Sequence, residues 1–104
     1  MYQSETKTRR SMQIILMQYH IRFHGVESLK DKNQRVARLV KFLGGHSDVA
    51  ASETELREEL DHSILSVLVV APNRKLLDQR KQQLEVALND RLDAEILDLQ
   101  QQFL

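Results

Sequence analysis

The sequence predicts one α+β domain whose strands and helices follow in the order β-α-β-β-α-β. Three observations predict it: a stretch of alternating polar and apolar residues, two stretches with helical periodicity, and a short run that is almost wholly apolar. A chain of 104 residues with 41% apolar and 29% charged residues is typical of a single globular domain. We expect residues 1–11 to form a flexible polar tail and residues 12–104 to form the domain.

The first strand is predicted over Met12–Phe23, where polar and apolar residues alternate. Successive residues of a strand point to opposite faces, so this pattern indicates one buried and one open face. The buried set includes both aromatic residues of the strand, Tyr19 and Phe23. The opposite face is a candidate oligomer face, because two of its residues are apolar and need cover. This candidate face consists of Ile14, Leu16, Gln18, His20 and Arg22.

The first helix is predicted over residues 28–43. Ser28 is a suitable N-cap, Asp31 stands at the capping-box position, and apolar residues recur at helical spacing beyond them. Gly44-Gly45 follows, where a left-handed glycine commonly ends a helix. Basic residues outside the apolar stripe are candidate phosphate contacts. The alternative is that they form an ordinary solvent-exposed helix face with no binding role. These candidates are Lys30, Lys32, Arg35, Arg38 and Lys41.

The second half of the domain contains three more strands and a helix. Residues 48–54 form a weak strand, and residues 63–71 form an apolar strand that we place at the centre of the sheet, covered on both faces. Residues 73–89 form a helix that Asn73 caps. The acidic residues 53–62 fit a loop, a strand end or a short helical turn.

The last strand is predicted over residues 94–104, with Leu97 and Leu99 on one face and Ile96 and Asp98 on the other. Each strand-helix-strand unit takes a right-handed crossover. The order of elements then gives a four-stranded antiparallel sheet with both helices on one face, which is the ferredoxin-like arrangement.

The chain resembles the YlxP-like family of small bacterial proteins of unknown function over roughly residues 12–104. The resemblance is carried by the helix opening Ser28-Leu29-Lys30-Asp31-Lys32, by Val49-Ala50, and by the apolar strand Ser66-Val67-Leu68-Val69-Val70. The family usually has a basic residue where Asn33 stands, and often a Trp that this chain lacks. The resemblance implies a ferredoxin-like fold, no established catalytic residues, and a link to translation through neighbouring genes.

The charge is unevenly divided along the chain. Residues 1–45 hold nine Lys/Arg against three Asp/Glu, whereas residues 46–104 hold six against twelve. Such a division fits a nucleic-acid surface, and it equally fits two halves that pair with each other in the fold or across a dimer. The absence of cysteine fits a reducing cytoplasm, and no apolar run is long enough to cross a membrane.

Motifs for catalysis are absent from the sequence. It contains no nucleophile elbow and no glycine-rich phosphate loop, so we predict no catalytic residue, no cofactor and no small-molecule substrate. His20 and His24 fall on one strand face, about 13 Å apart, while His46 and His62 fall in predicted loops, so we predict surface histidines and no metal site. The acidic run Glu53–Asp61 fits a solvated loop better than a divalent-cation site.

The sequence therefore predicts a cytoplasmic, non-catalytic binding module whose helix 28–43 contacts ribosomal RNA or the ribosome. The alternative is a structural or regulatory homo-oligomer, such as a homodimer, that assembles through the open sheet face.

Overall fold

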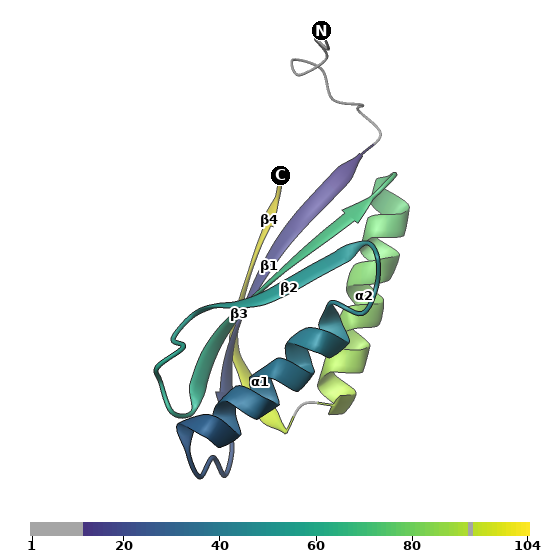
Figure 1. Cartoon of the computed structure of the whole chain (residues 1–104). Helices are drawn as coiled ribbons and strands as arrows, with labels where there is room; N and C mark the ends of the chain where they lie inside the picture. The colour runs from purple at the N-terminus through teal and green to yellow at the C-terminus, as the bar shows by residue number, and fades with distance from the viewer. Residues whose placement is uncertain (1–11, 92) are drawn as a thin grey trace, which may run out of the picture.

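The computed structural model describes residues 12–91 and 93–104, and the predicted tail, residues 1–11, lies outside this part of the chain. The elements follow one another in the predicted order, within two residues of the predicted bounds (Figure 1). They are β1 (Gln13–Phe23), α1 (Leu29–Leu43), β2 (Val49–Glu55), β3 (His62–Ala71), α2 (Arg74–Arg91) and β4 (Ala94–Phe103).

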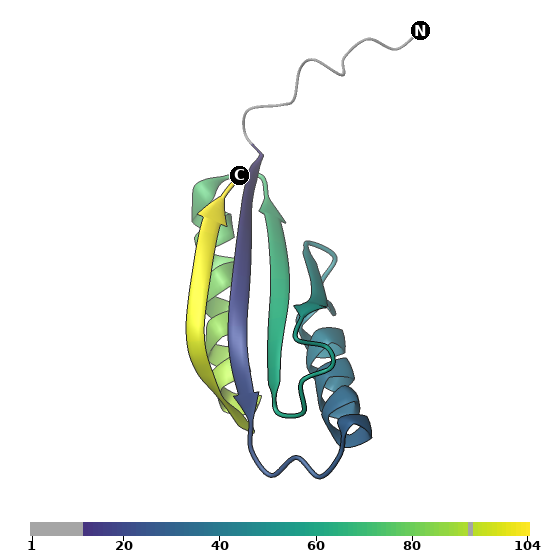
Figure 2. The same ribbon diagram turned by 90° about the vertical axis from the view of Figure 1, so that its left-hand side faces the viewer.

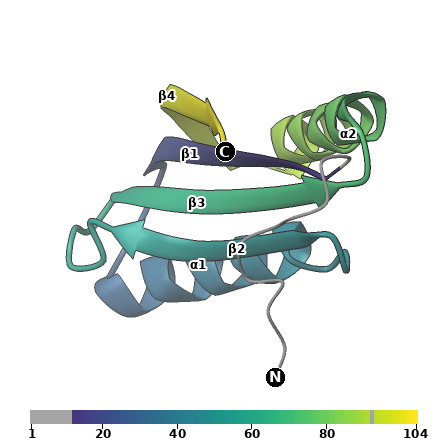
Figure 3. The same ribbon diagram turned by 90° about the horizontal axis from the view of Figure 1, so that it is seen from above.

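The strands form one antiparallel sheet in the order β2-β3-β1-β4. Both helices cover the same side of the sheet, so Figure 2 looks onto a face without helices. Seen from above, α1 lies along β2, and α2 lies beside β1 and the end of β3 (Figure 3). The predicted ferredoxin-like arrangement is confirmed.

The core lies between the sheet and the two helices. Every second side chain of β1 is buried, and Tyr19 and Phe23 are among them, as predicted. Burial raises the pKa of the Tyr19 phenol to about 12, and the Glu85 carboxylate adds to this shift. Each fully buried apolar side chain stabilises a fold by roughly 1.5–3 kcal/mol, so one stripe per helix holds both helices on the sheet. These stripes are Val36, Leu39 and Leu43 in α1, and Leu77, Leu84 and Leu88 in α2.

Helix α1 begins as predicted and ends in a different geometry. The Ser28 hydroxyl accepts a hydrogen bond from the Asp31 amide at 3.0 Å, and the Asp31 carboxylate accepts one from the Glu27 amide at 3.2 Å. At the other end, Gly44 has a φ of −84°, and among the described glycines only Gly25 has a positive φ, so the expected left-handed conformation at Gly44-Gly45 is wrong. A Cβ atom at Gly44 would lie 3.2 Å from the Val40 carbonyl oxygen, so the close approach of the backbone accounts for the glycine.

Helix α2 begins after Asn73, whose side-chain oxygen accepts a hydrogen bond from the Leu76 amide at 2.9 Å, as a cap does. The acidic segment before β3 adopts two of the three structures predicted for it, a strand end and a loop. Glu53 and Glu55 belong to the end of β2, and residues 56–61 form a loop in which Leu56 has a φ of 61°.

Strand β4 departs from its predicted pattern because it contains an irregularity. The register between β1 and β4 shifts between His20 and Ile21. An extra residue at a bulge changes which face the following side chains occupy. Ile96 therefore pairs with Ile21 and packs against the core, as Leu99 does, although we expected these two on opposite faces. Leu97, which we expected on the same face as Leu99, is exposed.

Candidate functional site

The structure divides the five basic residues of α1 into two groups, and Lys32 belongs to the inner one. Its side chain is fully buried, with Nζ 3.1 Å from Oε2 of Glu53 and donating to the Leu56 carbonyl at 2.7 Å. The same carboxylate oxygen accepts a hydrogen bond from the Ser63 hydroxyl at 2.7 Å. Lys32 thus fixes α1 to the end of β2 and to the loop after it, and its prediction as a phosphate contact is wrong.

The sequence contains a signal for this burial. Lys32, Val36, Leu39 and Leu43 follow one another at intervals of four, three and four residues, so all four lie on the inward stripe of the helix. A stripe defined by apolar residues alone omits the lysine. Glu53, the oppositely charged partner, lies in another element, and only the fold brings the two together.

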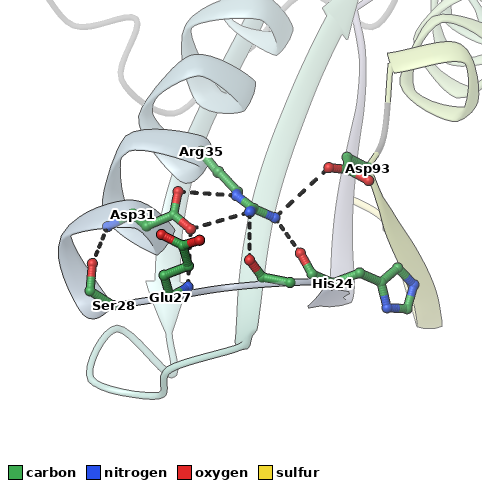
Figure 4. Close-up of polar contacts among 7 residues, drawn as sticks. His24, Glu27, Ser28, Asp31, Arg35 and Asp93 are labelled. Atoms are coloured by element: carbon green, nitrogen blue, oxygen red, sulfur yellow. Dashed lines mark hydrogen bonds and ion pairs between the residues drawn. The ribbon is translucent and has the colours of Figure 1, made fainter.

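The Arg35 side chain also makes its polar contacts with other residues of the protein, as Figure 4 shows. Its guanidinium group donates to the carbonyl of His24, to that of Gly25 at 3.0 Å, and to the Asp31 carboxylate at 3.2 and 3.3 Å. It also lies 3.9 Å from a carboxylate oxygen of Asp93. Arg35 therefore holds the β1–α1 loop against the helix.

The Asp31 carboxylate titrates at a lower pH because of these contacts. The hydrogen bond from the Glu27 amide is the largest cause that lowers its pKa below 3.8, and the Arg35 guanidinium contributes both a hydrogen bond and a charge. The positive charge of Arg38 adds to the effect. The N-terminal turn of α1 is thus a connected polar network at neutral pH.

The remaining basic residues of α1 point outward. Lys30, Arg38 and Lys41 are exposed, and none makes a hydrogen bond or ion pair with a residue in the described part of the chain. The first and last of them lie eleven positions apart, or about 16 Å along the helix axis. We call these three residues the basic face. These side chains can bind an anionic ligand without first breaking a hydrogen bond or an ion pair inside the protein.

A cleft of about 420 Å³ borders the basic face at Arg38. It lies between α1 and the segment that enters β4, with Phe23, Leu39 and Phe42 against it and Asp93 at its other side. Arg38 thus lies where the basic face meets this cleft, whose lining also includes the carboxylates of Asp31 and Asp93.

The candidate oligomer face lies on the side of the sheet without helices. Ile14 and Leu16 are half-buried there beside Leu68, and Val70 is exposed, so β3 is central but its second face is not covered by a helix. The other end of this face is polar and largely bonded internally. Its contacts are Gln18 to Ser66 at 3.1 Å, His20 to His62 at 2.9 Å, and Arg22 to Asp61 at 3.8 Å.

The contact between two histidines corrects the prediction for His62, which begins β3 rather than lying in a loop. Its Nδ1 is 2.9 Å from Nε2 of His20, and its Nε2 is 3.7 Å from the Asp61 carboxylate. Only the register of the two strands brings these side chains together. Among the described residues, no three His, Asp or Glu side chains gather in a way that would hold a metal ion.

The fold and the basic face together define a small ferredoxin-like α+β domain with a cationic helix surface. No helix within residues 12–91 or 93–104 has the length and apolar content needed to cross a bilayer.

The chain belongs to the DUF503 family, described as proteins of unknown function, whose family model matches residues 14–101. The match extends from β1 into β4, so all six elements contribute to it. No curated protein matches the chain.

Proposed function

We propose that this protein is a non-catalytic binding module that contacts the phosphate backbone of RNA through the basic face of α1. The observation that carries the proposal is the outward group of Lys30, Arg38 and Lys41, which lack a bonded partner among the described residues. Cations of this kind bind phosphates and release condensed counterions, which gives affinity without reading the base sequence.

The mode of binding follows from where the aromatic residues lie. RNA-recognition domains with a similar sheet stack bases on exposed aromatic side chains. Here Tyr19 and Phe23 are 2% and 5% exposed, on the side covered by the helices. The exposed Phe103 stands at the sheet edge with the Arg74 guanidinium 3.8 Å from its ring centroid, so its ring already has a cationic partner. Backbone contact therefore fits this protein better than base stacking. The resemblance to the YlxP-like family, with its link to translation, favours ribosomal RNA as the natural ligand.

The test is a titration of the full chain with ribosomal RNA at several salt concentrations. Three phosphate contacts on single-stranded RNA give a slope of log K against log salt of about −2. The variant K30Q/R38Q/K41Q loses most of this affinity and most of the slope. A matched control, R57Q/K75Q/K81Q, removes the same charge from the loop after β2 and from α2, and it keeps the affinity.

Two results would contradict the proposal. One is no binding of the unchanged chain at low salt. The other is an equal loss of RNA affinity in both triple variants, since binding would then depend on the net charge of the protein and not on the basic face. A folded circular dichroism spectrum for each variant is the control for stability.

A second candidate is a structural or regulatory homo-oligomer that assembles through the open sheet face. It is favoured by the apolar end of that face, where Ile14, Leu16 and Leu68 are half-buried and Val70 is exposed. Sedimentation of the variant L68K tests it. We expect dissociation if this face is the contact, and an unchanged mass would exclude the face.

A further inference from the structure

The two edges of the sheet differ in how well they are protected. A sheet edge presents unpaired backbone groups, and proteins usually blunt it with charge, short length or irregularity. The β2 edge has seven residues, two of them glutamates, and its register is irregular between Glu53 and Glu55. Strand β4 is longer, with ten residues, and runs along the outside of the sheet (Figure 2). Its two acidic residues, Glu95 and Asp98, and its register shift lie in the first half, so residues 99–103 form a regular edge without a charged residue or a proline.

The outward backbone groups of β4 can be assigned from its pairing with β1. The Leu104 amide donates to the Ile14 carbonyl at 3.0 Å, so it points toward β1. Because the direction alternates in an antiparallel ladder, the backbone groups of Gln100 and Gln102 also face β1, whereas those of Gln101 and Phe103 face outward. Within the described residues, no strand lies beyond β4 to receive these groups.

We propose that β4 pairs in antiparallel fashion with β4 of a second copy, about a two-fold axis at Gln100. The two sheets then form one continuous sheet with all four helices on one side. An axis perpendicular to the sheet keeps each side chain on its own face, so a residue can pair only with one an even number of positions away. This condition leaves few possible registers. They differ in which side chains of the two copies they set opposite each other.

The axis at Gln100 brings two exposed apolar side chains of neighbouring copies toward each other. Leu97, the unpaired residue at the register shift, comes near Phe103 of the second copy, and the two side chains are 42% and 45% exposed. This axis also sets Asp98 opposite Gln102 of the second copy, where an amide can donate to a carboxylate. Across residues 98–102, where the strand is regular, the pairing sets no like charges opposite each other.

The neighbouring registers fit less well. An axis at Asp98 sets that carboxylate opposite its own copy, which is unfavourable for like charges. An axis at Leu99 brings Glu95, on the far side of the register shift, toward the exposed Phe103, and an axis at Gln101 sets Asp98 opposite Leu104. The inference does not depend on RNA binding, because the basic face belongs to α1, which lies along β2 at the far side of the sheet (Figure 3).

Single cysteines test the register directly, since the chain contains none. Gln100 faces its own copy in a pair without mutual hydrogen bonds, where the Cα atoms lie about 4.5 Å apart, within reach of a disulfide. We expect Q100C to form a covalent dimer under mild oxidation, at twice the chain mass of 12.1 kDa. D98C and Q102C each stay monomeric when oxidised alone and form a mixed dimer when combined.

The matched control is Q18C, which lies beside Gln100 on the same face of the sheet. Its two copies would be three strand spacings apart, about 14 Å, so it does not cross-link in an edge dimer. It does cross-link if the open faces stack around this row, which would overturn the edge pairing. Self-linking of D98C, or a chain that sediments as a monomer at high concentration, would overturn it as well.

A second variant separates association from folding. Q101P removes an amide that points away from β1, so it leaves the β1–β4 ladder intact and removes one donor of the proposed pair. We expect a monomer with the circular dichroism spectrum of the unchanged chain. A dimer of unchanged stability would contradict the proposal.

Discussion

Helix α1 carries two groups of cations that look alike in the sequence and do different work in the fold. Lys32 and Arg35 point inward or sideways and each bond to backbone carbonyls and a carboxylate. Lys30, Arg38 and Lys41 point outward. The difference teaches that charge on a helix is structural where it falls on the packed stripe, and is free for a ligand only on the opposite side.

The largest expected effect is that of Lys32→Met. The substitution leaves the Glu53 carboxylate in a nearly buried site without its cation, and breaking a buried pair in this way costs about 3–5 kcal/mol. Urea denaturation measures the loss. Lys30→Met is the matched control on the outward side, and we expect it to stay within about 0.5 kcal/mol of the unchanged protein. The comparison fails if both variants lose the same stability.

A further double variant sharpens this result. Lys32→Met combined with Glu53→Leu removes both charges, so we expect it to recover much of the lost stability. No recovery would mean that the lysine acts through its bonds to the loop carbonyls rather than through the ion pair.

A smaller effect is expected for Arg35→Gln. It removes the bonds that hold the β1–α1 loop. One hydrogen bond to a charged group is worth about 1.5–3 kcal/mol, and water can reach this partly exposed site and replace part of the lost bonding, so we expect a total loss of roughly 2 kcal/mol. Arg38→Gln, one turn further along, is expected to leave the free energy of unfolding nearly unchanged. Hydrogen exchange of the amides in the β1–α1 loop would show the local release in the first variant and none in the second.

The smallest effect concerns Asp31, the carboxylate that Arg35 holds. Its pKa is lower in the folded chain than the ordinary 3.8. The stability it contributes is therefore present above pH 3.8 and is lost as the pH falls through the folded pKa. Asp31→Asn removes this dependence, so we expect a flatter stability profile below about pH 4. Glu58→Gln, in the exposed loop after β2, is the control, and an equal flattening in both variants would contradict the assignment.

Most of the fold follows from patterns that sequence displays directly. Alternation over β1, the capping residues Ser28 and Asn73, and the apolar run of β3 each report a local geometry, and each led to the correct element. The errors arose where geometry depends on a neighbour. The bulge that turns Ile96 inward is a property of the pairing between β4 and β1, and β4 alone does not reveal it.

The candidate site was predicted in part for the same reason. Helical spacing placed the outward residues Lys30, Arg38 and Lys41 correctly on one exposed surface. It could not show that Lys32 meets Glu53, which is 21 positions away, or that His20 meets His62. Contacts across elements need the register of the sheet.

The buried phenol of Tyr19 gives the protein an optical signal of its own. The chain has two tyrosines and no tryptophan, and the folded pKa of Tyr19, about 12, lies above the ordinary value of 10.0. Between these values the folded chain retains a proton that the unfolded chain releases, so stability falls as the pH rises through this interval. Phenolate absorbance in alkaline solution therefore records the opening of the core without any added dye or label.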